Sequence, residues 1–284
     1  MKLTNSVSIR GFFEEEARQG RRLLPNPRTV GGWGTCRKYE WAASLMAHPS
    51  VTRVVDIGCN RGSIEYLFHR LYPERSKATF ISGFDVCTSA ITQARELGLP
   101  NCQFDTYDGR ALPVDSESAD VALLVEVIEH AVNKEEVLRE AVRVLRPGGT
   151  LFLTTPNPSC LALKLETVLW TVLRVIFRKR AVQKDLFIHY DKLAKLLDGV
   201  GLQATSARLY FWPRLFVQFC EWSLLPPLPP SALFVYQHLC VDKLDHAELP
   251  GWLAKPVYWT LGGVLRKPVA PEDDSEDEAV RHLV

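Results

Sequence analysis

The chain has 284 residues, a formal net charge of +1 and a hydrophobic content of 46%. This length and composition fit one large globular domain, or two small ones, with a sizeable apolar core. The near-neutral charge argues against the basic surface that duplex nucleic acid requires, although an RNA end or loop stays open as a substrate.

The two ends of the chain differ in composition from its middle. Residues 1–34 are polar and then rich in glycine and proline, which predicts a flexible N-terminal arm. Residues 270–284 are strongly acidic and are predicted to form a disordered tail. The arm has no long apolar region typical of a signal peptide, and the seven cysteines form no C-x-x-C pair. We therefore expect a cytoplasmic protein with reduced cysteines.

The middle of the chain alternates between strands and helices. A helix at 35–48, with apolar residues at helical spacing, leads into the first strand. The expected strands are 52–57, 78–86, 102–108, 119–127 and 150–156, and the helices between them are 63–71, 89–97 and 135–145, the last ended by "RPGG". This alternation predicts an α/β fold with a mostly parallel sheet and helices on both faces.

The pattern changes after Pro158. Three apolar pieces are predicted there: an insert at 161–184, a second insert at 211–230 and a C-terminal extension at 246–269. The elements expected between them are a helix at 191–200 and strands at 202–211 and 232–241. The first insert begins with an apolar helix that carries one polar stripe, and the charges interrupt it too often for a membrane span.

Three interpretations of residues 161–180 compete. The segment covers a lipophilic acceptor as a lid, it contacts a membrane surface through its apolar face and basic "RKR" end, or it packs against the aromatic-rich segment 209–236. The apolar segments 211–230 and 246–269 would also need to be buried in the core, and one domain rarely buries three such segments beyond its sheet. For this reason a lid or a peripheral membrane contact ranks above core packing.

A strand–turn–helix junction stands out at "VVDIGCNRG", residues 54–62. Gly58 allows a sharp exit from the strand and a close approach of the backbone to a ligand, and Gly62 opens the helix. Asn60 stands where a glycine is expected, and asparagine is the next most tolerant residue of a left-handed backbone. Asp56 at the strand end disfavours a pyrophosphate and suits an ammonium group.

Acidic residues end three successive strands of the predicted sheet. Asp56, Asp85 and Asp108 each follow a β-rich run. Since the carboxyl ends of parallel strands meet at one edge of the sheet, the three side chains are expected to line one crevice. A single acid there is better explained as a helix cap or a solvated loop residue, but three in register indicate a binding site.

These motifs together resemble the class I S-adenosylmethionine-dependent methyltransferases. "VVDIGCNRG" and "FDV" are similar to the first two motifs of that family. "YDGRALPVDSESADVALLVEVIEH" and "VLREAVRVLRPGGTLFLTTPN" resemble the branch that includes the ubiquinone O-methyltransferases. The resemblance covers residues 51–158 strongly and 185–210 loosely. It implies a Rossmann-like, doubly wound sheet of seven strands within a methyltransferase domain at 35–245.

The resemblance also implies a role for each residue of the crevice. The turn would hold the methionine end of S-adenosylmethionine, Asp85 the ribose hydroxyls and Asp108 the adenine amine. Val86 would pack on the adenine and Gly109 would leave room for the ring. The residues assigned in this way to cofactor binding are Asp56, Gly58, Asn60, Gly62, Asp85, Val86, Asp108, Gly109 and Glu126.

The sequence "EVIEH" after the fourth strand allows three interpretations. In the first, Glu126 faces the cofactor while Glu129 and His130 are polar residues that begin a helix. In the second, His130 is a general base. In the third, the three side chains hold a divalent metal such as Mg²⁺. His189 is a further candidate ligand or base, although a surface histidine before a helix is the more frequent explanation of such a residue.

The function expected from these residues is methyl transfer to a small, apolar acceptor that bears a hydroxyl group, such as a quinol, phenol or polyketide. One alternative is an N- or C-methyltransferase, or an enzyme that methylates a lipid or glycolipid. Another is a cofactor-binding scaffold or regulatory subunit without chemistry. A nicotinamide dehydrogenase is disfavoured because the G-x-G-x-x-G spacing is missing. No feature of the sequence defines an oligomeric state.

Overall fold

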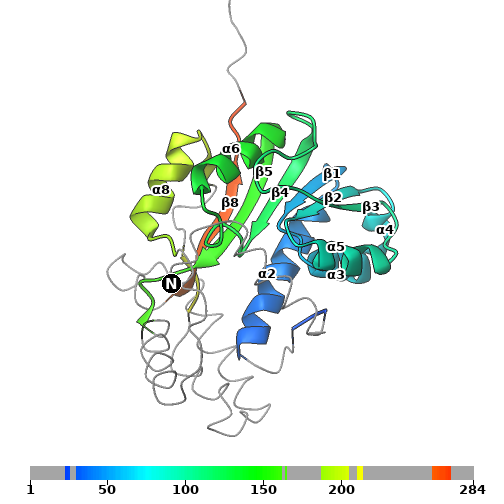
Figure 1. The fold of residues 1–284 in the computed structure, drawn as a ribbon, viewed down its shortest axis with the longest axis horizontal. Helices are drawn as coiled ribbons and strands as arrows, with labels where there is room; N and C mark the ends of the chain where they lie inside the picture. The colour runs from blue at the N-terminus through cyan, green and yellow to red at the C-terminus, as the bar shows by residue number, and fades with distance from the viewer. Residues whose placement is uncertain are drawn as a thin grey trace, which may run out of the picture.

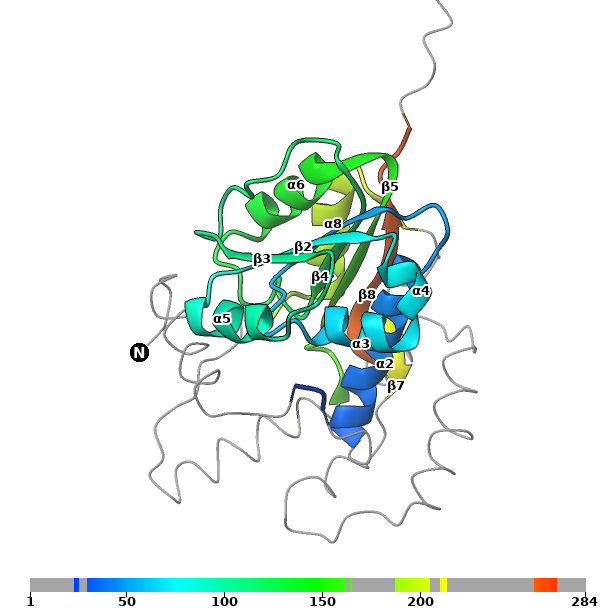
Figure 2. The ribbon, with the colours of Figure 1, turned by 90° about the vertical axis from the view of Figure 1, so that its right-hand side faces the viewer.

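An eight-stranded sheet forms the centre of the computed structural model, with helices on both of its faces (Figures 1 and 2). The structure describes residues 23–25, 30–161, 164, 187–204, 210–213 and 258–269. The strands are β1 (Arg53–Ile57), β2 (Phe80–Asp85), β3 (Cys102–Thr106), β4 (Ala119–Val125), β5 (Leu145–Pro156), β6 (Gln203–Ala204), β7 (Tyr210–Pro213) and β8 (Tyr258–Arg266).

The strand order is β3-β2-β1-β4-β5-β8-β6, and β7 pairs separately with β8. Strands β1 to β5 are parallel, as expected, and β8 runs antiparallel to β5. Among the described residues the sheet has eight strands where seven were expected; β6 and β7 both pair with β8, which was not expected, and the last expected strand lies outside the described residues. These two strands replace the single strand expected at 202–211.

Among the described residues, helices lie on both faces of the sheet (Figure 2). Helices α6 (Lys134–Val144) and α8 (Tyr190–Gly199) form the first layer. The second layer is formed by α2 (Val30–Met46), α3 (Ser63–Leu71), α4 (Pro73–Ser76) and α5 (Thr88–Glu96). The side chain of Asn133 caps the N-terminus of α6 by accepting a hydrogen bond from the backbone of Glu136.

Successive residues of the central strand β4 are buried on opposite faces of the sheet. Leu123 and Val125 belong to a core shared with α2 and α3, whereas Ala122 and Leu124 belong to a core shared with α6 and α8. All four are buried because a central parallel strand is covered on both faces. The continuous apolar run in the sequence therefore reflects two cores, one on each face of the sheet.

Three boundaries differ from those expected. Helix α2 begins at Val30, inside the segment predicted as a flexible arm. Strand β5 begins at Leu145 rather than at residue 150, so it includes the "RPGG" sequence, which ends α6 as expected. Strand β8 comes from the segment predicted as a C-terminal extension, and it joins the sheet at β5.

Most of the predicted inserts lie outside the described residues. These are nearly all of 161–184, residues 214–230 of the second insert, the strand expected at 232–241, and the tail 270–284. The lid or membrane role of 161–180 therefore stays a prediction, as does the division of the chain into arm, domain, extension and tail. Within the described part of the chain, no helix has the length and apolar character needed to cross a bilayer.

A carboxylate ties the first strand to the fourth at the edge opposite the strand ends. Asp120 Oδ2 accepts hydrogen bonds from the backbone of Thr52 and Arg53, at 2.6 and 2.8 Å, and from the Thr52 hydroxyl at 3.0 Å. Arg146 lies 2.6 Å from the other oxygen. Burial opposes ionisation of this group, but the hydrogen bonds and Arg146 prevail and lower the pKa of Asp120.

We expect Asp120→Asn to lower the free energy of unfolding by about 1–3 kcal/mol at pH 7, because bonded backbone donors lose a charged acceptor. A carboxyl with a lowered pKa stabilises the fold above its unfolded-state pKa of about 3.9 and loses this effect as the pH falls further. Urea unfolding of wild type and variant should therefore converge below about pH 4. The exposed Asp198→Asn serves as the control, with a change within about 0.5 kcal/mol.

Candidate functional site

A cavity of about 880 Å³ lies at the carboxyl ends of the parallel strands. Its wall comes from residues 23–25, from α2, from the loops that follow β1 to β4, and from the start of α6. The volume lies within the range of roughly 300–1,000 Å³ that is usual for small-molecule pockets. Ligands of doubly wound sheets bind at this edge, where the order of the strands reverses.

The turn after β1 is held by backbone hydrogen bonds to β2. Gly58 and Cys59 donate to the carbonyl of Phe84, and the backbone N–H of Asn60 donates to Asp85 Oδ2 at 2.9 Å. The φ angles of Gly58, Asn60 and Gly62 are 83°, 50° and 73°. Asn60 thus adopts the left-handed backbone that its position in the motif requires.

The two glycines of the turn serve different purposes. A Cβ on Gly58 would lie 2.3 Å from a methyl group of Val127, so this glycine allows the turn to approach the loop after β4 as well as the cavity. A Cβ on Gly62 would instead meet Leu97 and Phe104, at 3.1 and 3.2 Å. Gly62 is not part of the cavity wall and packs beside the end of α5 and β3, so its contact with a ligand stays a prediction.

The structure brings the three predicted acids onto one cavity. Asp56, Asp85 and Asp108 all line it, and they come from the ends of three different strands. Asp85 also organises the backbone around it, since Oδ2 holds Asn60 and Oδ1 accepts from the backbone of Cys87 at 2.8 Å. Asp108 Oδ1 accepts from the backbone of Arg110 at 2.9 Å, which leaves its side chain at the exposed end of the cavity.

Val86, Gly109 and Tyr107 line the cavity near Asp108. Val86 and Gly109 are neighbours, because a Cβ on Gly109 would lie 3.5 Å from a methyl group of Val86. Tyr107 lines the same part of the cavity, and its ring packs edge-on against Phe84 with 6.3 Å between centroids. Burial, followed by the charge of Asp85, raises the pKa of Tyr107, so its hydroxyl keeps its proton.

Glu126 is held at the end of β4 by a buried lysine. Lys38 on α2 is 5% exposed, and its Nζ lies 2.9 Å from Glu126 Oε1. The backbone of Glu126 is left-handed with a φ of 56°, which is uncommon for a residue other than glycine and is found often at functional sites. Tyr39, one residue after Lys38, also lines the cavity, and burial raises the pKa of its hydroxyl.

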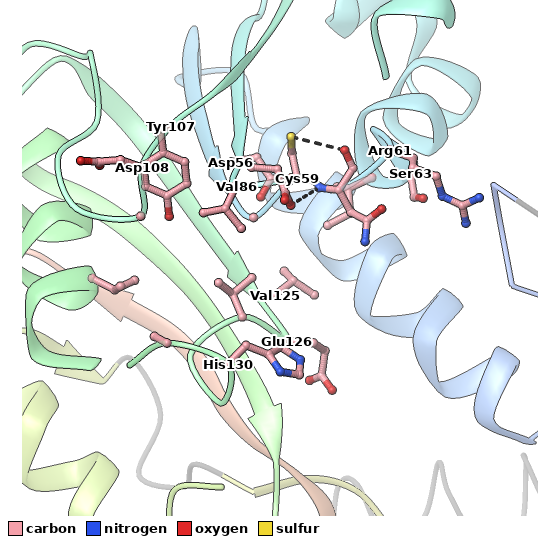
Figure 3. Close-up of a pocket in the computed structure, with 18 of the residues that line it drawn as sticks. Asp56, Cys59, Arg61, Ser63, Val86, Tyr107, Asp108, Val125, Glu126 and His130 are labelled. Carbon is pink, nitrogen blue, oxygen red and sulfur yellow. Dashed lines mark hydrogen bonds between the residues drawn. The ribbon is translucent and has the colours of Figure 1, made fainter. Parts of the chain in front are cut away.

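His130 and Glu129 point to different surroundings. His130 lines the cavity and lies beside Glu126 in Figure 3. Glu129 is 2% exposed, is not part of the cavity wall, and accepts a hydrogen bond from the Thr155 hydroxyl at 2.9 Å. Burial, followed by the charge of Glu126, raises the pKa of Glu129. His130 Nε2 lies 3.9 Å from Glu129 Oε1.

The metal interpretation of Glu126, Glu129 and His130 stays a prediction. In the part of the chain that is described, no three histidine, cysteine or acidic side chains are placed to hold a metal ion. Lys38 lies beside Glu126 and the Thr155 hydroxyl donates to Glu129, so each carboxylate already has a partner within the protein. The other predicted ligand, His189, is exposed at the N-terminus of α8 and does not line the cavity.

Several residues of the cavity wall were not expected from the sequence. Residues 23–25 line it, and two hydrogen bonds anchor them: Ser63 Oγ donates to the carbonyl of Leu23 at 2.7 Å, and Cys36 Sγ to that of Pro25 at 3.7 Å. The glycine- and proline-rich composition of this region predicted only a flexible arm. Tyr107 was also missed, although its place before Asp108 in "YDG" is a usable signal.

The cavity, the acids at three strand ends and the doubly wound sheet define a nucleoside-cofactor-binding α/β protein. Residues 48–191 match a family model described as a methyltransferase domain. The chain belongs to the class I S-adenosylmethionine-dependent methyltransferases. A solved methyltransferase of this kind from Archaeoglobus fulgidus has the same fold, with a TM-score of 0.52 and 15% identity over 82% of this chain and 94% of that chain.

Two curated relatives are ubiquinone biosynthesis O-methyltransferases. The protein from Paracidovorax citrulli is 28% identical over 121 residues, which cover 41% of this chain and 48% of the relative. The mitochondrial protein of Mus musculus is 32% identical over 196 residues, which cover 63% of this chain and 50% of the relative. The chain thus spans about half the length of these relatives.

Proposed function

We propose that the protein transfers a methyl group from S-adenosylmethionine to a hydroxyl group of a small apolar acceptor. The observation that carries this proposal is the position of His130. Its imidazole lines the same cavity as the three acids, and Ala131, Val132 and Val137 form the wall that follows it. The two ubiquinone-pathway relatives support an oxygen as the methylated atom, at low identity.

The residues of the cavity fit the cofactor. Asp85 and Asp108 offer carboxylate acceptors to hydroxyl and amine donors, and Val86 and Gly109 line the part of the cavity where a ring would lie. Asp56 supplies negative charge beside the turn for an ammonium group. S-adenosylmethionine, when bound, supplies an electrophilic methyl group on a sulfonium, which needs alignment with the acceptor more than it needs activation.

The chemistry left to the protein is alignment and proton removal. A hydroxyl becomes a better nucleophile as its proton leaves, and an imidazole is the side chain best suited to take a proton near neutral pH. His130 would accept that proton at a ring nitrogen facing the cavity. Lys38 fixes Glu126 beside it, so the wall next to His130 is held in place. The apolar residues after His130 would hold the acceptor and exclude water.

We expect His130→Ala to lower kcat for a hydroxyl acceptor by roughly 10²- to 10⁴-fold, the usual contribution of a general base. Binding of S-adenosylhomocysteine should change less than about threefold, because the acids that hold the cofactor remain. The measurement is transfer of a radiolabelled methyl group to catechols, quinols and phenols, with calorimetric titration of S-adenosylhomocysteine. Each assay is run with magnesium and with a chelator.

His189→Ala is the matched control, since His189 is exposed and outside the cavity wall. Its kcat should stay within about twofold of wild type. Wild-type kcat in His130→Ala would rule out His130 as the base. Binding of S-adenosylhomocysteine without methylation of any hydroxyl acceptor would instead favour an N- or C-methyltransferase, a lipid acceptor or a non-catalytic scaffold.

A further inference from the structure

Two buried carboxyl groups face each other behind the turn after β1. Asp56 ends β1 and is 1% exposed, and Glu65 lies on the first turn of α3 and is 0% exposed. The two side chains are close enough for each to act on the pKa of the other through its charge or its hydrogen bonding. Asp56 lines the cavity, whereas Glu65 lies behind it and is not part of the cavity wall.

This contact favours a shared proton. Two ionised carboxylates only accept hydrogen bonds, so a bond between them exists only when one oxygen carries a proton. Within the described residues, Asp56 Oδ2 and both oxygens of Glu65 are buried and have no hydrogen-bond donor within reach. Two adjacent negative charges away from water are also strongly unfavourable. Two such carboxyl groups are most stable when they share one proton and carry one negative charge.

The surrounding groups do not remove this constraint. Burial, then the charge and hydrogen bond of Glu65, then the charge of Asp85, raise the pKa of Asp56. Burial raises the pKa of Glu65, while Asp56 and His69 act in the opposite direction. The thiol of Cys59 in the turn and the hydroxyl of Tyr39 on α2 also face the pair, and both hold their protons because burial raises their pKa values.

We propose that Glu65 is a positioning residue that holds the Asp56 carboxyl in a proton-sharing pair, and that the pair releases its proton to solvent when an ammonium group enters the cavity beside Asp56. The ammonium group supplies the positive charge that allows both carboxylates to ionise. The proposal rests on the proposed function, in which the ligand carrying this group is the amino-acid end of S-adenosylmethionine. Glu65 acts through Asp56 and does not touch the ligand.

A pair that loses a proton on binding makes affinity depend on pH. Affinity for S-adenosylhomocysteine should rise with pH, by up to tenfold per pH unit, in the window above about pH 4 where the pair of the free protein still holds its proton. 5′-Methylthioadenosine shares the nucleoside but has no ammonium group, so its affinity should not follow this rise. Calorimetric titration of both ligands between pH 5 and 8.5, in buffers of different ionisation enthalpy, also counts the released protons.

Glu65→Gln is the informative variant. The amide keeps the shape of the side chain and can donate to Asp56, so Asp56 is ionised throughout and the pH dependence of S-adenosylhomocysteine binding should disappear. Glu74→Gln on the exposed surface of α4 is the matched control and should keep the wild-type pH profile. A purely structural role for Glu65 would weaken both ligands alike and leave the profile unchanged, which would overturn the proposal.

A second readout does not depend on any ligand. A carboxyl whose pKa is raised by folding stabilises the fold fully below its unfolded-state pKa, and this effect is lost as the pH rises through the folded-state value. The free energy of unfolding of wild type should therefore fall as the pH rises above about 4, and more steeply than that of Glu65→Gln. Equal slopes would show that no shared proton exists. If the slopes differ but neither ligand binds, the proton pair stands and the cofactor assignment, with the binding-linked release, fails.

Discussion

Asp85→Ala should lose affinity for S-adenosylhomocysteine by roughly 100-fold or more. The carboxylate bonds the backbone of Asn60 and of Cys87, and it is assigned to the hydroxyl groups of the ligand's ribose. A hydrogen bond to a charged group contributes about 1.5–3 kcal/mol, and each 1.4 kcal/mol is a tenfold change in affinity. Asp85→Ala removes both the hydrogen bond that holds Asn60 in the turn and the contact with the ribose, so the affinity should fall by at least two factors of ten. Calorimetric titration measures the change.

The control for Asp85→Ala is Asp105→Ala. Asp105 lies on β3, pairs with Arg95 and does not line the cavity, so its removal should change the affinity less than about threefold. Asp85→Asn separates charge from shape, and we expect it to fall between wild type and alanine. Wild-type affinity in Asp85→Ala, with an unchanged unfolding temperature, would refute the assignment of the cavity as the cofactor site.

Gly262→Ala should lower the free energy of unfolding by roughly 3 kcal/mol or more. Gly262 lies in β8 with a φ of 131°, and a Cβ there would lie 1.9 Å from the carbonyl oxygen of Leu153 in β5. That atom is backbone and cannot turn aside, so the two strands would have to separate. Backbone strain and overpacking cost about 1–3 kcal/mol each. Urea unfolding, followed by circular dichroism, measures the loss.

Gly199→Ala at the end of α8 is the control for this substitution. A Cβ at Gly199 would meet no atom within 4 Å, so the change should stay within about 1 kcal/mol of wild type. Wild-type stability in Gly262→Ala would contradict the close pairing of β5 with β8. Trypsin digestion adds a second readout. Gly262→Ala should be cleaved faster than Gly199→Ala, because separation of β8 from β5 exposes the edge of the sheet.

The sequence predicts the parallel half of the sheet because its signals are local. The apolar run, the glycine turn and the helical periodicity lie within a few residues of each other around Gly58, and the structure places a strand, a turn and a helix there. The pairing of β8 with β5 is different in kind. Nothing near "YWTLGGVLR" names its partner, and the adjacent Gly262 and Gly263 weaken any strand signal.

The difference between local signals and long-range packing also explains which parts of the site could be predicted. Acids at the ends of parallel strands meet at one edge by geometry, so the meeting of Asp56, Asp85 and Asp108 at one cavity could be predicted. The contacts of Glu126 with Lys38, and of Asp56 with Glu65, depend on how α2 and α3 pack against the sheet. Sequence spacing carries little information about such packing. The sequence therefore indicates Glu126 and Asp56 as site residues but does not indicate Lys38 and Glu65 as their partners.

The order of the strands also affects how the chain folds during synthesis. Strand β5 is complete at Pro156, yet its antiparallel neighbour begins only at Tyr258. While residues 157–257 are being made, the open edge of β5 can pair with other chains. The entropy cost of bringing together two strands so far apart in the sequence grows slowly with their separation. This cost is incurred before the pairing of β5 with β8 stabilises the fold. Synthesis thus leaves a period of aggregation risk at one edge of β5, and that period ends when the two glycines of β8 dock against it.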